Sequence, residues 1–284
     1  MKDIRQQNLL AAAFAGAPTL TTTLVTQAAP ATNDMTTEAR SPNDIQNAAP
    51  ATEDPWHFSL IPLGWLAGVG GNVTVHGHQA NTDVSFDQIL DHLKGIAMVD
   101  LELSKGRFGF YAQPNWIKLE ADGNVGPLRT TDEMQIWIVD AAFTYQLGKW
   151  GEEKPVTLDA LAGVRYWNIG NELTESGLFG LTSFNGSHTL SLIDPIIGLR
   201  AQIYLTRKLS LRLHGDIGGF GISEDSSNFS WQAMGMFGYD FSRHFSFGIG
   251  YRALSVDKHT GGGSSLEGAH IILHGAILAF DFHW

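Results

Sequence analysis

From Trp56 onward, apolar and polar residues alternate with a period of two over about ten segments of roughly 10–14 residues each. The pattern is clearest in Lys208–Phe220, where Leu209, Leu211 and Leu213 alternate with polar residues. The same region has no apolar run near the roughly 18 residues that a membrane-spanning helix requires. The segments are therefore predicted to be β-strands with one apolar and one polar face. They centre on 56–69, 95–104, 107–121, 133–148, 155–170, 189–205, 208–221, 228–242, 244–257 and 270–284.

The connections between these segments alternate in length. The short ones are Lys105-Gly106, Lys149–Lys154, Thr206-Arg207 and Arg243. The long ones lie near 70–94, 122–132, 171–188, 222–227 and 258–269. Short turns at one end and long loops at the other are typical of outer-membrane barrels, whose short turns face the periplasm. We predict an all-β fold, a closed antiparallel up-and-down transmembrane β-barrel of about ten strands with both ends periplasmic.

The two faces of the segments differ in charge. The polar face carries Arg, Asp, Gly and Gln, whereas the other face is almost free of charge. A soluble periplasmic barrel or sandwich is the alternative, but soluble exteriors carry many Lys and Glu, which these strands nearly lack. The apolar face is therefore expected to contact lipid and the polar face to line the lumen. In the first long loop, Phe86, Ile89, Leu90 and Leu93 predict a short amphipathic helix that caps the barrel mouth or lies across it.

The N-terminal region is typical of an exported protein. Lys2 and Arg5 precede an apolar stretch from Leu9 to Ala17, and an Ala-x-Ala site follows at Ala29–Ala31. Residues 1–31 are predicted to be a signal peptide, with a membrane anchor as the alternative. Residues 32–55 are rich in Ala, Thr, Asn and Pro and are predicted to be a disordered linker before the barrel of 56–284. The chain has no Cys, which suits an oxidising compartment.

Five segments carry a resemblance to a known family. They are Ser85–Leu90, Ala162–Trp167, Asp194–Arg200, Gly215–Gly221 and Gly250–Leu254. As an ordered set, they resemble a family of small outer-membrane β-barrel proteins of Gram-negative bacteria with no assigned function. The resemblance implies a barrel in the outer membrane, and it brings no reaction, ligand or catalytic residue.

The polar face predicts a network of charges inside the barrel. Arg165, Arg200 and Arg252 each follow a glycine by two residues, so each glycine is expected to leave room for a guanidinium across the lumen. Buried charges must be paired or hydrogen-bonded. Near the periplasmic end we place Glu102, Asp159, Asp240 and Asp281 beside Arg200 and Arg212. Higher in the barrel we place Asp100, Asp140 and Asp216 beside Arg165 and Arg252, and Asp194 completes the network.

This network leads to three functional hypotheses. The first is a non-enzymatic, porin-like barrel with a plugged or very narrow polar lumen and a structural or surface-interaction role, needing no cofactor. The second is a passive channel that prefers cations, because eight acids face four arginines. The third is a hydrolase at the outer rim. Its candidate residues are His76, His78, Asp83, His188, His259 and His270.

The last strand predicts how the chain reaches the membrane. Leu278, Phe280, Phe282 and Trp284 alternate with polar residues, and outer-membrane barrels commonly end on such aromatic residues. We expect the barrel assembly machinery to read this strand as an assembly signal. The other expected partners are outer-membrane lipid and lipopolysaccharide. The formal net charge of −11 argues against a nucleic-acid partner.

Overall fold

The computed structural model describes residues 55–75, 78–125, 128–176, 183–261 and 267–284. The predicted signal peptide and all but the last residue of the predicted linker lie outside the described residues, so both remain predictions. No helix in the described part of the chain has the length and apolar character to cross a membrane.

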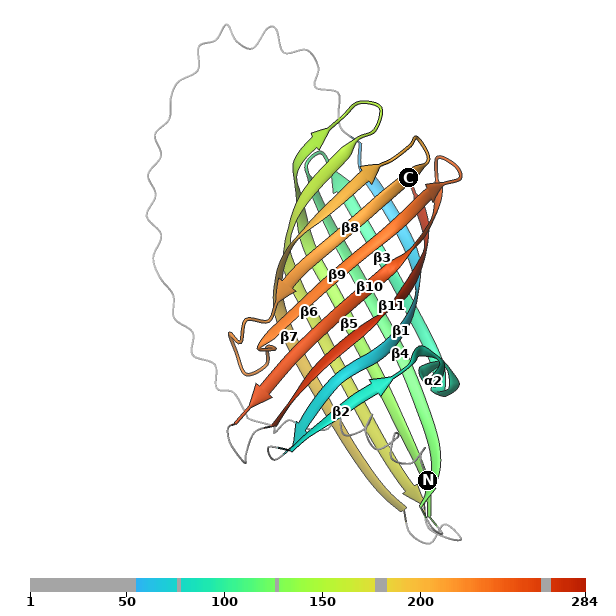
Figure 1. Cartoon of the computed structure of the whole chain (residues 1–284), viewed down its shortest axis with the longest axis vertical. Coiled ribbons are helices and arrows are strands. Elements are labelled where there is room, and N and C mark those ends of the chain that lie inside the picture. The colour runs from blue at the N-terminus through green and yellow to red at the C-terminus, as the bar shows by residue number, and fades with distance from the viewer. Residues whose placement is uncertain (1–54, 76–77, 126–127, 177–182, 262–266) are drawn as a thin grey trace, which may run out of the picture.

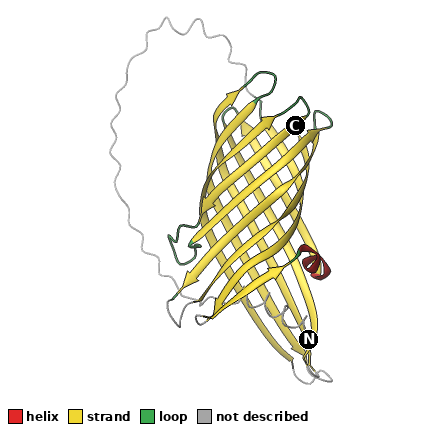
Figure 2. Ribbon diagram, viewed as in Figure 1, coloured by secondary structure: helices red, strands yellow, loops and turns green. Residues whose placement is uncertain are grey.

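Ten antiparallel strands close into a barrel, as predicted, since the last strand pairs with the first (Figures 1 and 2). An eleventh strand, β2 (His78–Val84), pairs with the outer part of β1. The predicted helix is present as α2 (Phe86–His92). The barrel strands are β1 (His57–Val75), β3 (Leu93–Lys105), β4 (Phe108–Val125), β5 (Leu128–Trp150), β6 (Val156–Ser176), β7 (Ser183–Tyr204), β8 (Leu209–Gly218), β9 (Phe229–Asp240), β10 (Phe245–Thr260) and β11 (Glu267–His283).

The two ends of the barrel differ in their connections. At one end, here called the terminal end, the two ends of the described chain meet and the turns are short, and Phe58 and Trp284 exchange backbone hydrogen bonds of 3.2 and 2.9 Å. At the opposite end, here called the hairpin end, the ladders of β4–β5 and β6–β7 continue to the pairs Val125–Leu128 and Ser176–Ser183. The expectation of long loops over 122–132 and 171–188 was therefore wrong for most of these residues, which extend the strands.

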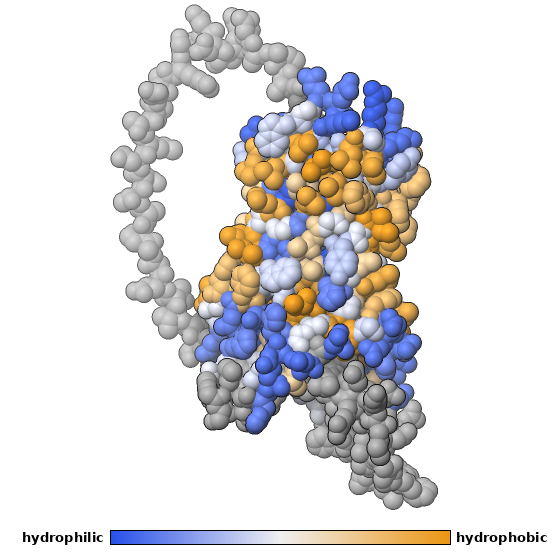
Figure 3. Space-filling model, viewed as in Figure 1, coloured by the Kyte–Doolittle hydropathy of each residue, from blue (hydrophilic) through white to orange (hydrophobic). Residues whose placement is uncertain are grey.

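On the face that Figure 3 shows, most apolar side chains lie between two more polar ends, and some polar residues lie among them. On β5, the outward side chains from Trp137 to Leu147 are apolar or aromatic, and the polar Glu133 and Gln135 precede them on the same face. This span matches the ~9–11 tilted residues that a transmembrane strand needs. The outward face is therefore built to contact hydrocarbon.

The wall of the barrel has one stretch in which β1 lacks a partner on one side. β1 pairs with β3 over His57–Pro62 and with β2 over Val69–Val75, so the edge formed by 63–68 is unpaired on that side. Pro62 is the last residue of the β1–β3 ladder. We call this stretch the wall gap. Helix α2 contacts β1 and β4 beside it, against the barrel wall and not across the mouth (Figure 1).

The lumen changes character halfway along the barrel. On β5, Met134, Ile136 and Ile138 point inward on the hairpin side of Asp140 and are buried. On β10, Leu254 lies inward on the hairpin side of Arg252. The prediction of a polar lumen was therefore wrong for the hairpin half, where both faces of the strands are apolar. Polar and charged side chains dominate the remaining half.

Candidate functional site

Buried charged side chains cross the middle of the lumen, where the apolar half ends. We call them the middle layer, and its members come from strands β5, β6, β8, β9 and β10. They are Asp140, Arg165, Asp216, Gln232 and Arg252. All five point inward because they occupy alternate positions on the polar face of their strands.

Arg165 joins two carboxylates in this layer. Its Nε donates to Asp140 Oδ1 at 2.6 Å, and its Nη2 reaches Asp140 Oδ2 at 3.2 Å and Asp216 at 3.1 Å. A planar guanidinium can bridge two strands in this way because its five donors form a fixed fork. Arg165 therefore ties β6 to β5 and, across one strand, to β8.

Arg252 completes the middle layer from β10. Its Nε and Nη2 donate to Gln232 Oε1 at 2.9 and 2.5 Å, and Nη2 also lies 3.5 Å from Asp140 Oδ2. The guanidinium carbon lies 4.7 Å from the centre of the Trp65 ring, which is cation–π geometry. Asp140 thus accepts from both arginines, and the layer spans the lumen from β1 to β10.

A second group of charges lies nearer the terminal end, and we call it the terminal layer. Glu102 Oε1 lies 2.7 Å from Arg200 Nη1 and 3.4 Å from Arg212 Nη1. Arg200 Nε also lies 3.5 Å from Asp159, and Arg212 Nη2 lies 3.9 Å from Asp281. These side chains are 16–20 % exposed and open into a polar vestibule of about 450 Å³, so water reaches them.

Three predicted members of the network have no arginine partner among the described residues. Asp194 accepts from Trp167 Nε1 at 3.0 Å and from the backbone N and Oγ of Ser227 at 2.7 and 2.8 Å. It therefore anchors the β8–β9 connection. Asp240 accepts from Ser246 Oγ at 2.7 Å. Asp100 lies beside Glu102 in the terminal layer, not higher in the barrel, and its buried Oδ1 has no hydrogen-bond partner among the described residues.

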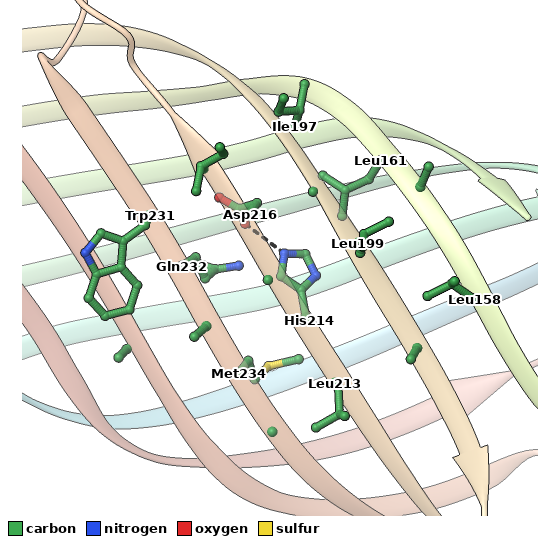
Figure 4. A pocket seen from close by; sticks show the side chains of 18 of the residues that line it. Leu158, Leu161, Ile197, Leu199, Leu213, His214, Asp216, Trp231, Gln232 and Met234 are labelled. Carbon is green, nitrogen blue, oxygen red and sulfur yellow. Dashed lines mark hydrogen bonds and ion pairs between the residues drawn. The ribbon is translucent and has the colours of Figure 1, made fainter. Parts of the chain in front are cut away.

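The sequence interpretation left out several polar residues that complete the network. Nε2 of His214 lies 2.8 Å from Asp216 Oδ2 (Figure 4). Gln232 Oε1 accepts a hydrogen bond from Arg252 Nε, and Gln202 Oε1 accepts one from Arg212 Nε. All three occupy the same inward positions as the charges around them, so the period-two pattern could have found them. Leu213, the neighbour of His214 on β8, points to the outward face instead (Figure 4).

The reason given for the Gly-x-Arg repeats was wrong. A Cβ added at Gly163 would overlap the carbonyl oxygen of Ala141, and one at Gly250 would overlap that of Gly235. A Cβ added at Gly198 would likewise overlap the carbonyl oxygen of Gly215. These glycines allow the backbones of neighbouring strands to approach closely, which is different from making room for a guanidinium.

The rim residues proposed for a hydrolase are only partly assembled. His259 Nδ1 contacts the Asp257 carboxylate, and Ser255 Oγ lies 3.4 Å from His270 Nε2. Ser255 is 2 % exposed, so no substrate could reach its hydroxyl. His78 and Asp83 are exposed on β2. His76 and the side chain of His188 lie outside the described residues.

The C-terminal aromatic residues lie on the outward face at the terminal end. Phe280, Phe282 and Trp284 are exposed there, and Leu278 is half-buried. The Trp284 ring stacks on Phe58 with ring centres 5.7 Å apart. The last strand thus presents apolar side chains to the surroundings of the barrel, and its role as an assembly signal stays a prediction.

Comparison with known proteins concerns the fold. No family model and no curated protein matches this sequence. Among solved structures, the outer membrane protease OmpT from Escherichia coli matches with a TM-score of 0.50 and 9 % identity over 84 % of this chain and 99 % of that one. The translocator domain of the autotransporter NalP from Neisseria meningitidis gives a TM-score of 0.35 at 11 % identity, over 99 % and 95 % of the two chains.

A third structure, the attachment invasion locus protein Ail of Yersinia pestis in complex with sucrose octasulfate, gives a TM-score of 0.33 at 11 % identity. It covers 80 % of this chain and 98 % of that one. At such low identities the likeness concerns the fold alone. The fold is that of a Gram-negative outer-membrane β-barrel, in agreement with the resemblance seen in the sequence.

Proposed function

We propose that this protein is a non-enzymatic outer-membrane β-barrel of a Gram-negative bacterium whose lumen is closed to ions. It is exported with a cleaved signal peptide and has a structural or surface-interaction role. The observation that carries this proposal is the burial of the middle layer. Asp140 and Arg165 are 0 % exposed, Arg252 is 1 % exposed and Asp216 is 4 % exposed.

Burial of these groups argues against a water-filled path. In an open channel, the polar atoms of the narrowest layer face the water column, whereas here each arginine is engaged by carboxylate or amide oxygens. The apolar half beyond the layer adds a second barrier, because a dry hydrocarbon-lined segment excludes hydrated ions. About ten strands also enclose little more than the side chains that point inward.

The partners follow from the two surfaces described above. The outward apolar band supports contact with outer-membrane lipid and lipopolysaccharide. The outward aromatic residues of β11 support recognition by the barrel assembly machinery.

Conductance across planar bilayers tests the closed lumen against the cation channel. We expect the wild-type protein to be silent, and Arg252→Ala to be silent as well but to unfold at a lower temperature. Arg243→Ala is the matched control, because Arg243 is exposed beside the vestibule and has no contact with the middle layer. Steady openings of the wild type that scale with salt concentration would overturn the proposal in favour of a channel.

A further inference from the structure

Basic residues gather in the turns at the terminal end of the barrel. The chain has 18 Lys and Arg residues, and seven of them lie in the four short segments 105–107, 149–154, 206–208 and 242–244. These segments connect successive strands, so the bases are spread around the rim, where Figure 3 shows strongly hydrophilic residues. All seven residues are exposed, and we call them the basic rim. They are Lys105, Arg107, Lys149, Lys154, Arg207, Lys208 and Arg243.

The carboxylates at this end do not neutralise the basic rim. Glu152 and Glu153 are the acidic residues in the same four segments. Asp240 lies beside one segment but faces the vestibule, where it accepts from Ser246 Oγ. Within the described part of the chain, no member of the rim forms an ion pair with a carboxylate. The rim therefore carries an excess of positive charge in a chain whose formal net charge is −11.

Lysines toward the hairpin end are used differently. Lys94 Nζ lies 3.2 Å from Glu120, and Lys118 Nζ lies 2.7 Å from Glu133. Lys258 Nζ donates to two backbone carbonyl oxygens at 2.6 Å each. These bases have partners within the chain, whereas the basic rim holds charges of one sign that repel one another. An external anion would relieve that repulsion.

The basic rim lies at the level of an aromatic girdle. Lys105 Nζ is 5.4 Å from the centre of the Trp56 ring, and Lys208 Nζ is 6.0 Å from that of Tyr239. Exposed aromatic rings of this kind mark the membrane interface of barrels. Because the turns are short, their basic side chains stay close to these rings. The rim is therefore at the height where lipid headgroups meet the barrel.

We infer that the basic rim binds the phosphate groups of anionic phospholipids in the leaflet at the terminal end. The inference rests on the proposed function, because it requires that the barrel spans a membrane. A spread of bases around the rim fits many separate headgroups better than one soluble anion in a pocket. Arg can donate to a phosphate through two nitrogens, and Lys approaches it as a point charge. Attraction of this kind falls off within a Debye length, so salt should remove it.

Electron spin resonance measures this preference with spin-labelled phosphatidylglycerol and spin-labelled phosphatidylcholine. Each probe is added to phosphatidylcholine vesicles that contain the purified protein, and lipids in contact with the barrel show restricted motion. The restricted fractions give the relative association constant of the two lipids. In the wild type we expect phosphatidylglycerol to associate about threefold more strongly at low salt, and equally in about 1 M NaCl. Equal association at low salt would refute the inference, as would a preference that high salt leaves unchanged.

The residues of the rim are tested by neutral substitutions. Arg107→Gln, Arg207→Gln and Arg243→Gln are combined in one chain. They leave in place the two lysines that contact aromatic rings. We expect the preference for phosphatidylglycerol to fall by at least half, because three of the seven charges are lost. An unchanged preference would show that the rim does not bind the headgroups.

The matched control removes the same charge from the hairpin side. It combines Lys94→Gln, Lys118→Gln and Lys258→Gln, whose ammonium groups already have partners within the chain. We expect it to keep the preference of the wild type. An equal loss in both triple variants would assign the effect to net charge and overturn the role of the rim. Heat-modifiable migration on gels confirms that each variant is folded.

The same spectra separate this inference from the proposed function. If neither lipid shows a restricted component, the barrel is not in the bilayer, and both fail. If both lipids are restricted equally, the barrel is in the bilayer and the inference alone fails. Deletion of 32–53 tests another occupant, because this segment carries four acidic residues and one arginine. A preference for phosphatidylglycerol that appears only after the deletion would assign the rim to that segment instead of lipid.

Discussion

Replacing Arg165 with methionine should destabilise the barrel more than any comparable change in the terminal layer. Arg165 is fully buried between Asp140 and Asp216, at 2.6 and 3.1 Å. Methionine keeps much of the side-chain volume but leaves Asp140 with only the 3.5 Å contact to Arg252 and Asp216 with only the contact to His214. Removing one partner of a buried pair costs about 3–5 kcal/mol, so we expect the free energy of unfolding to fall by about that amount.

Arg200→Met is the matched control. Arg200 pairs with Glu102 at a similar distance, 2.7 Å, but the two side chains are 17 % and 20 % exposed. Water in the vestibule can solvate the carboxylate that remains, so the expected loss is about 1 kcal/mol. Both variants would be unfolded by urea from lipid vesicles, with the free energy taken by linear extrapolation of the tryptophan signal.

A second substitution separates charge from packing. Asp140→Asn added to Arg165→Met removes one of the two carboxylates that lose their Arg165 partner, so part of the lost stability should return. Equal losses for Arg165→Met and Arg200→Met, or no recovery in the double variant, would refute the view that the middle layer is held by charge compensation in a dry environment.

Three further predictions concern other parts of the chain. Phe282→Ala should lower the yield of folded protein in the outer membrane more than Phe229→Ala, and equal yields would contradict the assembly role. Deleting 32–53 behind a working signal peptide should leave heat-modifiable folding intact, whereas loss of folding would give this segment a structural role. Gly163→Ala should destabilise the barrel, because its Cβ meets a neighbouring strand, while Gly64→Ala, with open space around the Cβ, should be neutral; thermal unfolding compares the two.

The sequence predicts the barrel well because strand alternation is a local property. Each strand repeats it independently, so the closed ten-stranded ring and the helix at Phe86–His92 both follow from short windows. The same alternation predicts that the charged side chains point into the barrel. Which residue each charge contacts depends on how far neighbouring strands are shifted relative to one another, and the sequence of a single strand does not contain that information. Asp194 therefore binds Trp167 and Ser227 and not an arginine.

The apolar half of the lumen was missed although the sequence contains its signal. Ile136, Trp137, Ile138 and Val139 form a run in which the period-two pattern disappears. Such a run means that both faces of the strand are buried in apolar surroundings, one in lipid and one in the lumen. The hairpin extensions were missed for the opposite reason, because beyond the membrane both faces of β4 and β5 carry polar residues.

The two halves of the lumen constrain transport in different ways. In the proposed closed barrel, the charged middle layer blocks the axis by size and by its paired charges, and the apolar half beyond it excludes hydrated ions. Conductance therefore tests both barriers at once, because an ion crossing the lumen would have to pass the four buried charges of the middle layer and the apolar half beyond it.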